Sequence, residues 1–367
     1  MNTRFIDRRR LARLRGWARF YGRRQGWLNE RMTPRKLREM TIAGIDFLER
    51  RENVRAFPLV LKIDISPACQ LACPACVHAT PRGDGGRLDL QLFSGPQRMA
   101  LADYRRIIDE VAGHSLAVSL YYLGDPYAHP QADEFCRVAF DAGLNVHVSS
   151  NLSYRWSDQR IAEVVHSGVT HLTACVDGAT QDVYELNRVG GRLPWVLSNL
   201  ERLATYKRRE GLKYPRLEVQ FVQYPHNRSQ REEVRQMVAG VGIRRFAVEN
   251  GSPGNWAERP PPEEGHFSGR QGELIPRCHM PWSSMTIRYD GNAIPCCLHR
   301  IGEQYTAQPP RHLLGNVLES SVWSVWNGST YRAIRRISSD PARAESMGEL
   351  QSSFCNGCTR VTRRAPS

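Results

Sequence analysis

The sequence lacks the long apolar runs that a membrane span requires, although its 367 residues leave ample room for one. A transmembrane helix needs about 18 or more consecutive apolar residues, and no stretch approaches that length. The arginine-rich N-terminus also lacks the apolar segment of a secretory signal. Both absences predict a cytoplasmic protein, in which the ten cysteines indicate metal or redox chemistry rather than disulfides.

Most of the chain also has little net charge. The whole sequence carries 51 Lys and Arg against 37 Asp and Glu, which gives a net charge of +14. Residues 1–40 hold 13 basic and 3 acidic side chains, or +10, so the remainder contributes only +4. Because the basicity belongs to one segment, it does not predict nucleic-acid binding by the body of the protein.

The basic segment, residues 1–57, is predicted to be helical. Apolar residues recur at helical spacing at Leu11, Leu14, Trp17 and Tyr21, with Arg8, Arg13, Arg15, Arg19 and Arg23 between them. Such a helix can lie on an anionic membrane surface or bind an acidic partner. The favoured interpretation is a helix packed on the barrel with its arginines in solvent. Thr33 and Pro34 then predict the start of a second helix that runs to about residue 52.

From residue 58 onward, short apolar strands alternate with helical patterns, which predicts a parallel sheet built from βαβ units. The predicted strands are 59–65, 116–123, 144–149, 169–176, 216–223 and 243–249. The predicted helices are 101–113, 131–142, 157–167, 193–209 and 229–240. The expected fold is therefore α/β, a partial (β/α)6 TIM-like barrel over 58–250. A Gly- and Pro-rich linker at 251–277 leads to a small cysteine-rich hairpin and helix domain at 278–367.

Three cysteines stand directly after the first predicted strand, at Cys69, Cys73 and Cys76. Active sites of parallel α/β proteins lie at the carboxyl ends of strands. Three thiolates so close in sequence can hold one small metal centre. A structural zinc ion requires four ligands, and His78 could be the fourth. A 4Fe–4S cluster bound by three cysteines instead leaves one iron open for a substrate or cofactor.

The next three strands also end in polar or turn-forming motifs. Gly124, Asp125 and Pro126 follow the second strand, Ser149 to Asn151 end the third, and Asp177 follows the fourth, with Arg188 further on. Each motif alone has an ordinary structural explanation, such as a turn, a helix cap or a surface arginine. Their recurrence at successive strand ends favours a shared site.

These motifs together resemble those of the radical S-adenosylmethionine (radical SAM) enzymes. The resemblance implies that Cys69, Cys73 and Cys76 bind a 4Fe–4S cluster whose open iron chelates SAM. It implies SAM contacts for Gly124, Asp125, Pro126, Ser149, Asn151 and Asp177, and places Arg188 against the SAM carboxylate. Reductive cleavage of SAM would then yield a 5′-deoxyadenosyl radical that abstracts hydrogen from substrate. Ala75 departs from the family pattern, which often has an aromatic residue before the third cysteine.

A second set of cysteines follows the linker. Cys278, Cys296, Cys355 and Cys358 offer four thiolates, and Asp290-Gly291 predicts a hairpin between the first two. This pattern resembles the SPASM or twitch domain of a radical SAM subclass, which implies one auxiliary 4Fe–4S cluster fully bound by protein. A zinc site with four cysteines is the structural alternative. Cys297 beside Cys296 leaves the choice of ligand open.

Two cysteines remain outside both sets. Cys136 lies in a predicted helix beside Phe135, which indicates a small core residue. Cys175 lies two positions before Asp177 on one strand, so both side chains share a face of the sheet. A thiol on the barrel interior could donate a hydrogen atom to a radical, although a buried strand cysteine is the simpler interpretation.

The sequence thus predicts a radical SAM oxidoreductase that oxidises or cross-links a peptide or small-molecule substrate. The auxiliary cluster would transfer electrons, and a flavodoxin or ferredoxin would be the reductant. A further hypothesis is that the basic N-terminal helix contacts a membrane surface or an acidic partner. The competing prediction is a zinc-stabilised nucleic-acid-binding protein without catalysis, which the near-neutral body of the chain disfavours.

Overall fold

The structure is a computed structural model, and it describes most but not all of the chain. The described residues are 11, 13–18, 20–22, 30–74, 76, 98–251, 278–296, 313–340 and 355, with the backbone also described at 274–276 and 362–364. In these residues no helix is long and apolar enough to cross a membrane. His78, Cys297, Cys358 and most of the predicted linker lie outside the described residues.

The chain divides into two compact units that do not follow chain order. One unit contains residues 63–105 and 118–261, and the other contains 1–62, 106–117 and 262–367. The chain passes between them within strands β1 (Val60–Ile63) and β2 (Ala117–Ser119) and within helix α3 (Leu101–Val111). The domain limits expected from the sequence remain a prediction.

The first unit is built on parallel strands that alternate with helices. Its strands are β3 (Asn145–Ser150), β4 (His171–Cys175), β5 (Arg216–Gln223) and β6 (Arg245–Asn250), in the order β6-β5-β4-β3. All pair in parallel, and β6 is the edge of the sheet among the described strands. The sheet is therefore open, which confirms the predicted α/β partial barrel.

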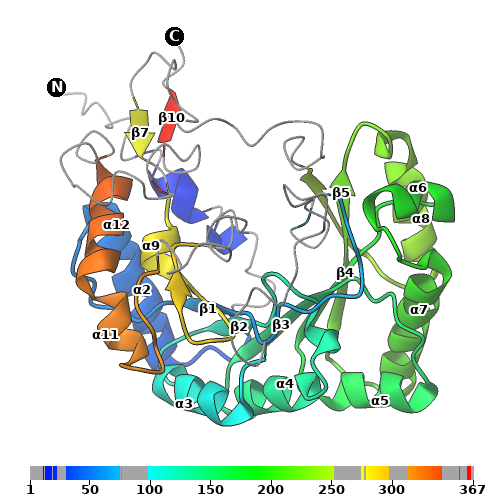
Figure 1. Ribbon diagram of the computed structural model, residues 1–367, viewed down its shortest axis with the longest axis horizontal. Helices are drawn as coiled ribbons and strands as arrows, with labels where there is room; N and C mark the ends of the chain where they lie inside the picture. The colour runs from blue at the N-terminus through cyan, green and yellow to red at the C-terminus, as the bar shows by residue number, and fades with distance from the viewer. Residues whose placement is uncertain are drawn as a thin grey trace, which may run out of the picture. The chain divides into compact units, whose positions relative to one another are not determined.

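Helices α4 (Ala132–Asp141), α5 (Asp158–His166), α7 (Leu193–Arg209) and α8 (Arg231–Gly240) lie on one side of these strands (Figure 1). The side chains beneath the helices are apolar and fully buried, as at Val148, Leu172, Val219 and Phe221. The cause is the alternation of residue types along each strand, since successive side chains point to opposite faces. Each predicted strand and helix of this unit is present, with shifts of a few residues at the ends.

Short elements of this unit escaped the sequence prediction. Helix α6 (Gln181–Asn187) lies between β4 and α7, and 3-10 turns occupy Pro126–Ala128 and Arg228–Gln230. Strand β2 is also shorter than predicted: it ends at Ser119, and the next residue, Leu120, still donates to the His147 carbonyl at 2.9 Å. Helix α6, the two 3-10 turns and β2 are too short to show a clear helical or strand periodicity in the sequence.

The second unit packs the N-terminal helices against C-terminal elements of the chain. Helix α2 (Pro34–Glu49) begins at Thr33, whose hydroxyl accepts from the Lys36 amide, as the Thr33-Pro34 motif predicts. The other elements are β7 (Leu274–Pro276), α9 (Met280–Ser283), β8 (Ser284–Ile287), β9 (Ala293–Ile294), α11 (Val322–Trp326), α12 (Ser329–Ser339) and β10 (Thr362–Arg364). Strands β8 and β9 form the predicted antiparallel hairpin around Gly291, whose φ is +82°.

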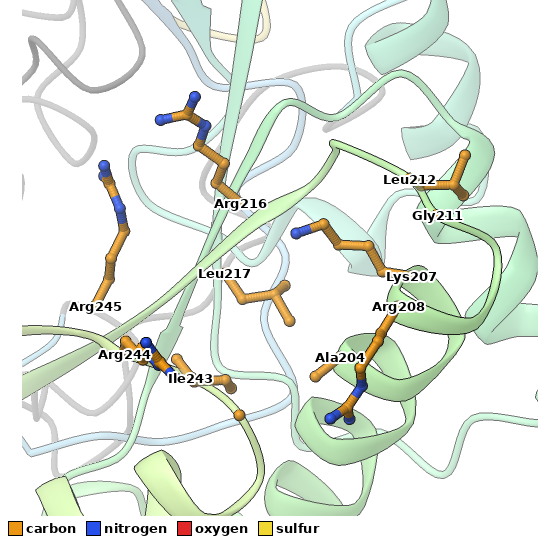
Figure 2. A pocket seen from close by; sticks show the side chains of 11 residues that line it. Ala204, Lys207, Arg208, Gly211, Leu212, Arg216, Leu217, Ile243, Arg244 and Arg245 are labelled. Carbon is orange, nitrogen blue, oxygen red and sulfur yellow. The ribbon is translucent and has the colours of Figure 1, made fainter.

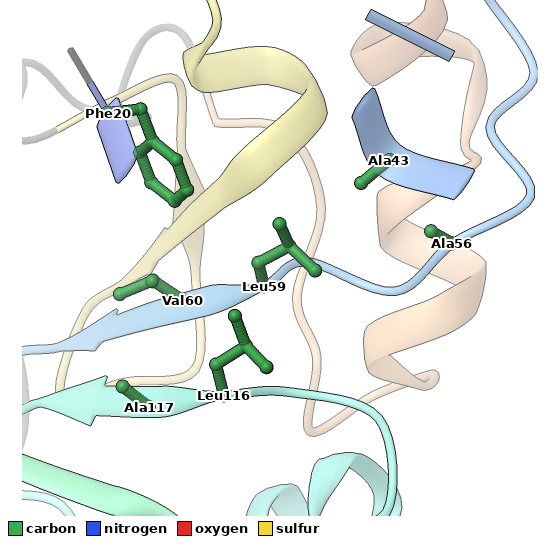
Figure 3. Close-up of a cluster of buried hydrophobic side chains, with 7 residues drawn as sticks. All are labelled: Phe20, Ala43, Ala56, Leu59, Val60, Leu116 and Ala117. Carbon is green, nitrogen blue, oxygen red and sulfur yellow. The ribbon is translucent and has the colours of Figure 1, made fainter. Parts of the chain in front are cut away.

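The core of this unit joins residues that are distant in sequence. Leu59 and Val60 pack with Leu116 and Ala117, while Phe20, Ala43 and Ala56 close the same cluster (Figure 3). Trp17 stacks on Phe47 with ring centroids 5.7 Å apart. The N-terminal helix therefore packs through Trp17 and through Phe20, which is only 2% exposed.

The packing of the N-terminal helix differs in detail from the expected stripe of apolar residues. Leu11 and Leu14 are 37% and 44% exposed, so they lie outside the packed face. Phe20 rather than Tyr21 occupies the core position. Arg13 donates to the Leu48 carbonyl at 3.0 Å, so one of the predicted solvent-facing arginines also holds the helix on α2.

Candidate functional site

The predicted site residues of the barrel all belong to one compact unit. The cysteine loop follows β1, the Gly124 turn follows β2, Ser149 and Ser150 end β3, and Asp177 lies two residues beyond β4. Parallel strands end at the same edge of a sheet, so these segments meet at one edge. This edge is where parallel α/β proteins carry their active sites.

Three half-buried thiols line the loop after β1, and none is in a disulfide. Burial and the neighbouring Asp125 carboxylate raise the pKa of Cys69 to about 12. Burial also raises the pKa of Cys73, while the Arg188 guanidinium, which donates a hydrogen bond to this thiol, opposes the rise. The raised pKa values favour neutral thiols in the absence of a metal. A bound metal would reverse this preference, because thiols that bind metals are deprotonated.

The three thiols of this loop lie close to one another. Cys69, Cys73 and Cys76 are within electrostatic reach of each other. In an iron–sulfur cubane each thiolate binds a different iron, so three thiols in one loop can hold such a cluster and leave one iron open.

Asp125 anchors the ends of two neighbouring strands. Its carboxylate accepts from the Ser150 hydroxyl at 2.8 Å, from the Asn151 amide nitrogen at 2.7 Å and from Asn151 Nδ2 at 2.6 Å. The Tyr127 backbone amide donates to the other oxygen at 3.1 Å. Burial raises the pKa of Asp125, and these donors oppose the rise. The carboxylate is thus engaged by the protein, which makes it a positioning group.

Gly124 is required by the close approach of the cysteine loop. A Cβ at this position would lie 2.2 Å from the Ser66 carbonyl oxygen and 2.4 Å from that of Ala68. The loop is held there because the Asp125 amide donates to the Ala68 carbonyl at 2.9 Å. The small residue therefore lets the loop that carries Cys69 pack against the end of β2.

Asp177 and Arg188 form a buried ion pair. Arg188 Nε donates to Asp177 Oδ2 at 2.6 Å, and the Asp177 side chain is fully buried. The same carboxylate accepts from Asn187 Nδ2 and from the Val222 amide at 2.7 Å. Burial lowers the pKa of Arg188, but Asp177, together with Cys175, Cys73 and Tyr184, raises it well above its ordinary value. Arg188 therefore stays charged beside Cys73.

The inner face of the sheet is polar, which sequence analysis missed. Ser119 Oγ lies 3.1 Å from His147 Nδ1, and His147 Nε2 lies 3.0 Å from Thr173 Oγ1. Cys175 continues this row, with its sulfur 4.0 Å from Gln220 Oε1. Strands of a parallel sheet buried on both faces are normally apolar throughout. A polar row across β2 to β5 therefore indicates a face that meets a ligand, and the alternation of His147 and Ser149 with valines was the available signal.

Other functional residues missed from the sequence support the cysteine loop. Gln70 Nε2 donates to Asn151 Oδ1 at 2.9 Å, and the Tyr154 hydroxyl donates to Gln70 Oε1 at 3.1 Å. Asn151 Nδ2 also reaches the Cys69 sulfur at 3.8 Å. Ser149, by contrast, makes no side-chain hydrogen bond to any residue that the structure describes. Of the predicted SAM contacts, Ser149 is thus the one whose hydroxyl is available to a ligand.

Cys175 and Cys136 are both buried thiols. Burial raises the pKa of each, which keeps both protonated near neutral pH. Cys136 is fully buried within helix α4, as predicted. Cys175 is 8% exposed on the polar row of the sheet. Only Cys175 therefore has a position from which a thiol hydrogen could reach a ligand.

Three of the predicted auxiliary ligands are described, and all belong to the second unit. Cys296 follows β9, and the Cys278 carbonyl accepts from Arg50 at 3.0 Å. Tyr331 of α12 is fully buried, and its pKa is raised by burial and further by the nearby Cys296 and Cys355 thiols. The Cys296 and Cys355 thiols therefore both lie near Tyr331 of α12.

Comparison with known proteins gives independent information. Residues 278–359 match the SPASM family, described as an iron–sulfur cluster-binding domain. PqqA peptide cyclase of Ruegeria pomeroyi is 26% identical over 206 residues, which cover 55% of this chain and 50% of that protein. The chain therefore spans about half the length of this curated relative.

Solved structures with a similar fold include Streptococcus suis SuiB. SuiB bound to S-adenosylmethionine has a TM-score of 0.59 and 14% identity, covering 91% of this chain and 83% of SuiB. SuiB bound to its precursor peptide SuiA has a TM-score of 0.58, also at 14% identity, covering 86% of this chain and 74% of SuiB. At this identity the likeness concerns the fold alone. With the SPASM match and the curated relatives, it confirms that the chain resembles radical SAM enzymes that carry a C-terminal SPASM domain.

Proposed function

We propose that this chain is an enzyme that reductively cleaves S-adenosylmethionine and uses the resulting radical to oxidise or cross-link a peptide. The observation that carries the proposal is the joining of the Cys69–Cys76 loop to the ends of β2 and β3 through Asp125, Asn151 and Gln70. A loop that held only a structural metal would not need this link to the ends of two further strands. The link holds the thiols over the edge of the sheet where a cofactor can reach them.

In this proposal Cys69, Cys73 and Cys76 hold a 4Fe–4S cluster. When bound, the cluster supplies the electron that cleaves SAM. Arg188 donates a hydrogen bond to Cys73 and neutralises thiolate charge next to the cluster. Asp177 holds the guanidinium in this position, which leaves its outer N–H groups for a carboxylate. Arg188 is therefore our candidate for binding the carboxylate of SAM.

The remaining SAM contacts are proposed to divide into two roles. Ser149 would contact the cofactor directly, because its hydroxyl is not engaged by the described residues. Asp125 and Asn151 would act indirectly, because their polar groups already bind the protein. Gly124 and Pro126 would shape the backbone beside the cofactor, since a larger residue than glycine would displace the cysteine loop. Asp177 would also act indirectly, because it holds Arg188 in position.

The polar row of the sheet is the proposed substrate face. Ser119, His147 and Thr173 form a continuous hydrogen-bonded chain across three strands. Such a chain offers donors and acceptors to a peptide backbone. Cys175 at its end is a candidate hydrogen donor to a radical, because its thiol is protonated and faces the same side.

The C-terminal cysteines are proposed to bind a second cluster. Cys278, Cys296, Cys355 and Cys358 would fill all ligand positions, with Cys297 as the alternative to Cys296. A fully bound cluster has no open iron for substrate, so its chemistry is to accept or relay an electron. This suits oxidation or cross-linking, in which a substrate radical must lose an electron. A flavodoxin or ferredoxin is the proposed reductant.

A peptide is the proposed substrate class. The curated relative is named for a peptide, PqqA, and the SuiB structure was determined with a precursor peptide. The sequence alone left both a peptide and a small molecule open as substrates. The names of these proteins favour the peptide, and the polar row is compatible with it.

The test is anaerobic purification and reconstitution, followed by iron and sulfide analysis and an assay for 5′-deoxyadenosine after addition of dithionite and SAM. The expected result is about eight irons per chain and SAM cleavage. Cys73→Ala should abolish cleavage, while Cys136→Ala, which alters a buried thiol outside the site, should retain it. Cys355→Ala should lose about four irons and keep cleavage.

The same measurements decide against the proposal if they differ. Zinc in place of iron, with no cleavage, would identify a zinc-stabilised protein and reopen the nucleic-acid-binding hypothesis. Cleavage that persists in Cys73→Ala would mean that the first cysteine set is misassigned. About four irons per chain with full SAM cleavage would indicate one cluster, in the barrel. The C-terminal cysteines would then bind zinc.

A further inference from the structure

A basic pocket lies at the amino ends of strands β5 and β6, the ends opposite to those that carry the candidate site. Its volume is about 370 Å³, and all its lining residues belong to the barrel unit. Leu212, Leu217 and Ile243 supply apolar surface, and cationic side chains surround them (Figure 2). Ligand pockets of proteins commonly have volumes of about 300–1,000 Å³. The pocket is therefore large enough for several side chains of a peptide.

Five cationic side chains line this basic pocket, and no carboxylate does. They are Lys207 and Arg208 of α7, Arg216 of β5, and Arg244 and Arg245 at the start of β6. Glu218, which does not line the pocket, pairs with Arg245 in the β5–β6 register. The lining thus keeps a large positive excess, although the body of the chain is almost neutral.

The electrostatics of the pocket indicate that its charges are crowded. Lys207 is half-buried, and burial lowers its pKa. Burial and the neighbouring Arg245 lower the pKa of Arg216. In Figure 2 the Arg216 and Arg245 side chains extend in the same direction, and the Lys207 side chain extends from α7 into the space between them and the helix. An anionic ligand would relieve this repulsion.

Helix electrostatics explain only part of the cluster. Helix α7 ends in Lys207, Arg208 and Arg209, and cations at a helix carboxyl end are favoured by its dipole. Arg216, Arg244 and Arg245 lie on strands and a loop, where no such dipole acts. Their convergence on the same pocket therefore requires another explanation, such as a ligand of opposite charge.

We propose that the basic pocket binds an acidic, partly apolar segment of the peptide substrate, at a distance from the residue that reacts. This inference rests on the proposed function, which supplies the peptide. The five cations all line this pocket, but their charged groups point in different directions around the apolar residues (Figure 2), so they suit a series of carboxylates with an apolar side chain between them. A single phosphate would instead need converging donors.

The distance between the basic pocket and the candidate site is compatible with a peptide whose acidic segment binds in the pocket while another of its residues reacts. Strand β5 begins at Arg216 in the pocket and ends at Gln223, beside the Val222 amide that binds Asp177. Eight strand residues span about 25 Å. An extended peptide of similar length would therefore place its acidic segment in the pocket and another residue at the cofactor.

The test is fluorescence anisotropy with a short fluorescein-labelled peptide of glutamate and leucine residues, added to the reconstituted full chain. The same peptide with glutamine in place of glutamate is the charge control. The first peptide should bind more tightly, and its binding should weaken as salt is raised. Lys207→Ala/Arg244→Ala should raise its Kd about fivefold, since each exposed pair contributes modestly.

Arg105→Ala/Arg231→Ala is the matched control, because it removes two exposed cations of the same unit outside the pocket. This variant should bind the acidic peptide as the wild type does. Both double variants should retain SAM cleavage without substrate. Equal binding of the glutamine peptide, or equal loss of affinity in both double variants, would overturn the proposal. Binding to phosphatidylglycerol vesicles or to pyrophosphate that exceeds peptide binding, and depends on Lys207 and Arg244, would also overturn it.

SAM cleavage separates the two hypotheses. A protein that binds the acidic peptide through Lys207 and Arg244 but does not cleave SAM would support the pocket and reject the proposed function. A protein that cleaves SAM but does not prefer the acidic peptide would retain the function and reject the pocket.

Discussion

Arg188 is held against Asp177 by a 2.6 Å hydrogen bond between its Nε and the carboxylate, in a site where the Asp177 side chain is fully buried. The pair links the end of helix α6 to the loop after β4, and it directs the guanidinium toward Cys73. A charge placed in this way next to a thiolate stabilises it. The ion pair thus connects the fold to the chemistry of the first cysteine set.

Breaking this ion pair should destabilise the protein strongly. Asp177→Asn leaves Arg188 buried without its counter-charge, and the expected loss is about 3 kcal/mol of the free energy of unfolding. Asp158→Asn is the matched control, because it breaks an ion pair with Arg202 in which the Asp158 side chain is 98% exposed. The control should lose less than about 1 kcal/mol. Urea unfolding followed by circular dichroism measures both, and equal losses would contradict the importance of the buried pair.

The Gly124 turn should not tolerate a side chain. Gly124→Ala would put a Cβ 2.2 Å from the Ser66 carbonyl, so the cysteine loop must move, at a cost of about 1–3 kcal/mol. We expect a lower melting temperature and reduced iron content in the barrel. Gly240→Ala is the control, since a Cβ there meets no atom within 4 Å, and alanine favours the helix. A Gly124→Ala protein with normal melting and full iron would show that the loop has room to adjust.

Lys36 should make stability depend on alkaline pH. Burial, with a contribution from Arg31, lowers its pKa from 10.5 to about 8 in the folded protein. Between these values the unfolded chain binds more protons than the folded one, so the free energy of unfolding rises with pH from about 8 to 10.5. Lys36→Met should remove this rise and add about 2 kcal/mol near neutral pH.

The control for Lys36 is Lys213→Met, which replaces an exposed lysine. It should leave the pH profile of urea unfolding unchanged. If Lys36→Met and the wild type show the same rise in stability above pH 8, the buried ammonium is not its source.

Cys175 should donate hydrogen to a radical formed at the candidate site. In D2O its thiol carries deuterium, so quenching of the 5′-deoxyadenosyl radical in the absence of substrate would give deuterated 5′-deoxyadenosine and a thiyl radical. Cys175→Ala should lower the deuterated fraction, while Cys136→Ala, which alters a thiol inside helix α4, should not. Mass spectrometry measures the fraction. An unchanged fraction in Cys175→Ala would rule out this thiol as the donor.

The sequence by itself determined the alternation of strands and helices, the parallel sheet and the resemblance to radical SAM enzymes. These features have local signals, because helix periodicity, strand alternation and turn residues act over a few positions. The two cysteine sets and the motifs at the strand ends could be identified from the sequence for the same reason. Strand β5 and helix α7 match their predicted limits, since each is bounded by charged or turn-forming residues.

Only the tertiary structure decided which groups are free and which are engaged. Asp125 and Asp177 were predicted to contact the cofactor, but both carboxylates bind partners that lie 10 to 45 positions away in sequence. The role of Phe20 in the core, the hydrogen-bonded row through His147, and the convergence of five cations at the basic pocket are equally non-local. Sequence spacing does not encode such contacts, because they depend on how separate strands and helices pack.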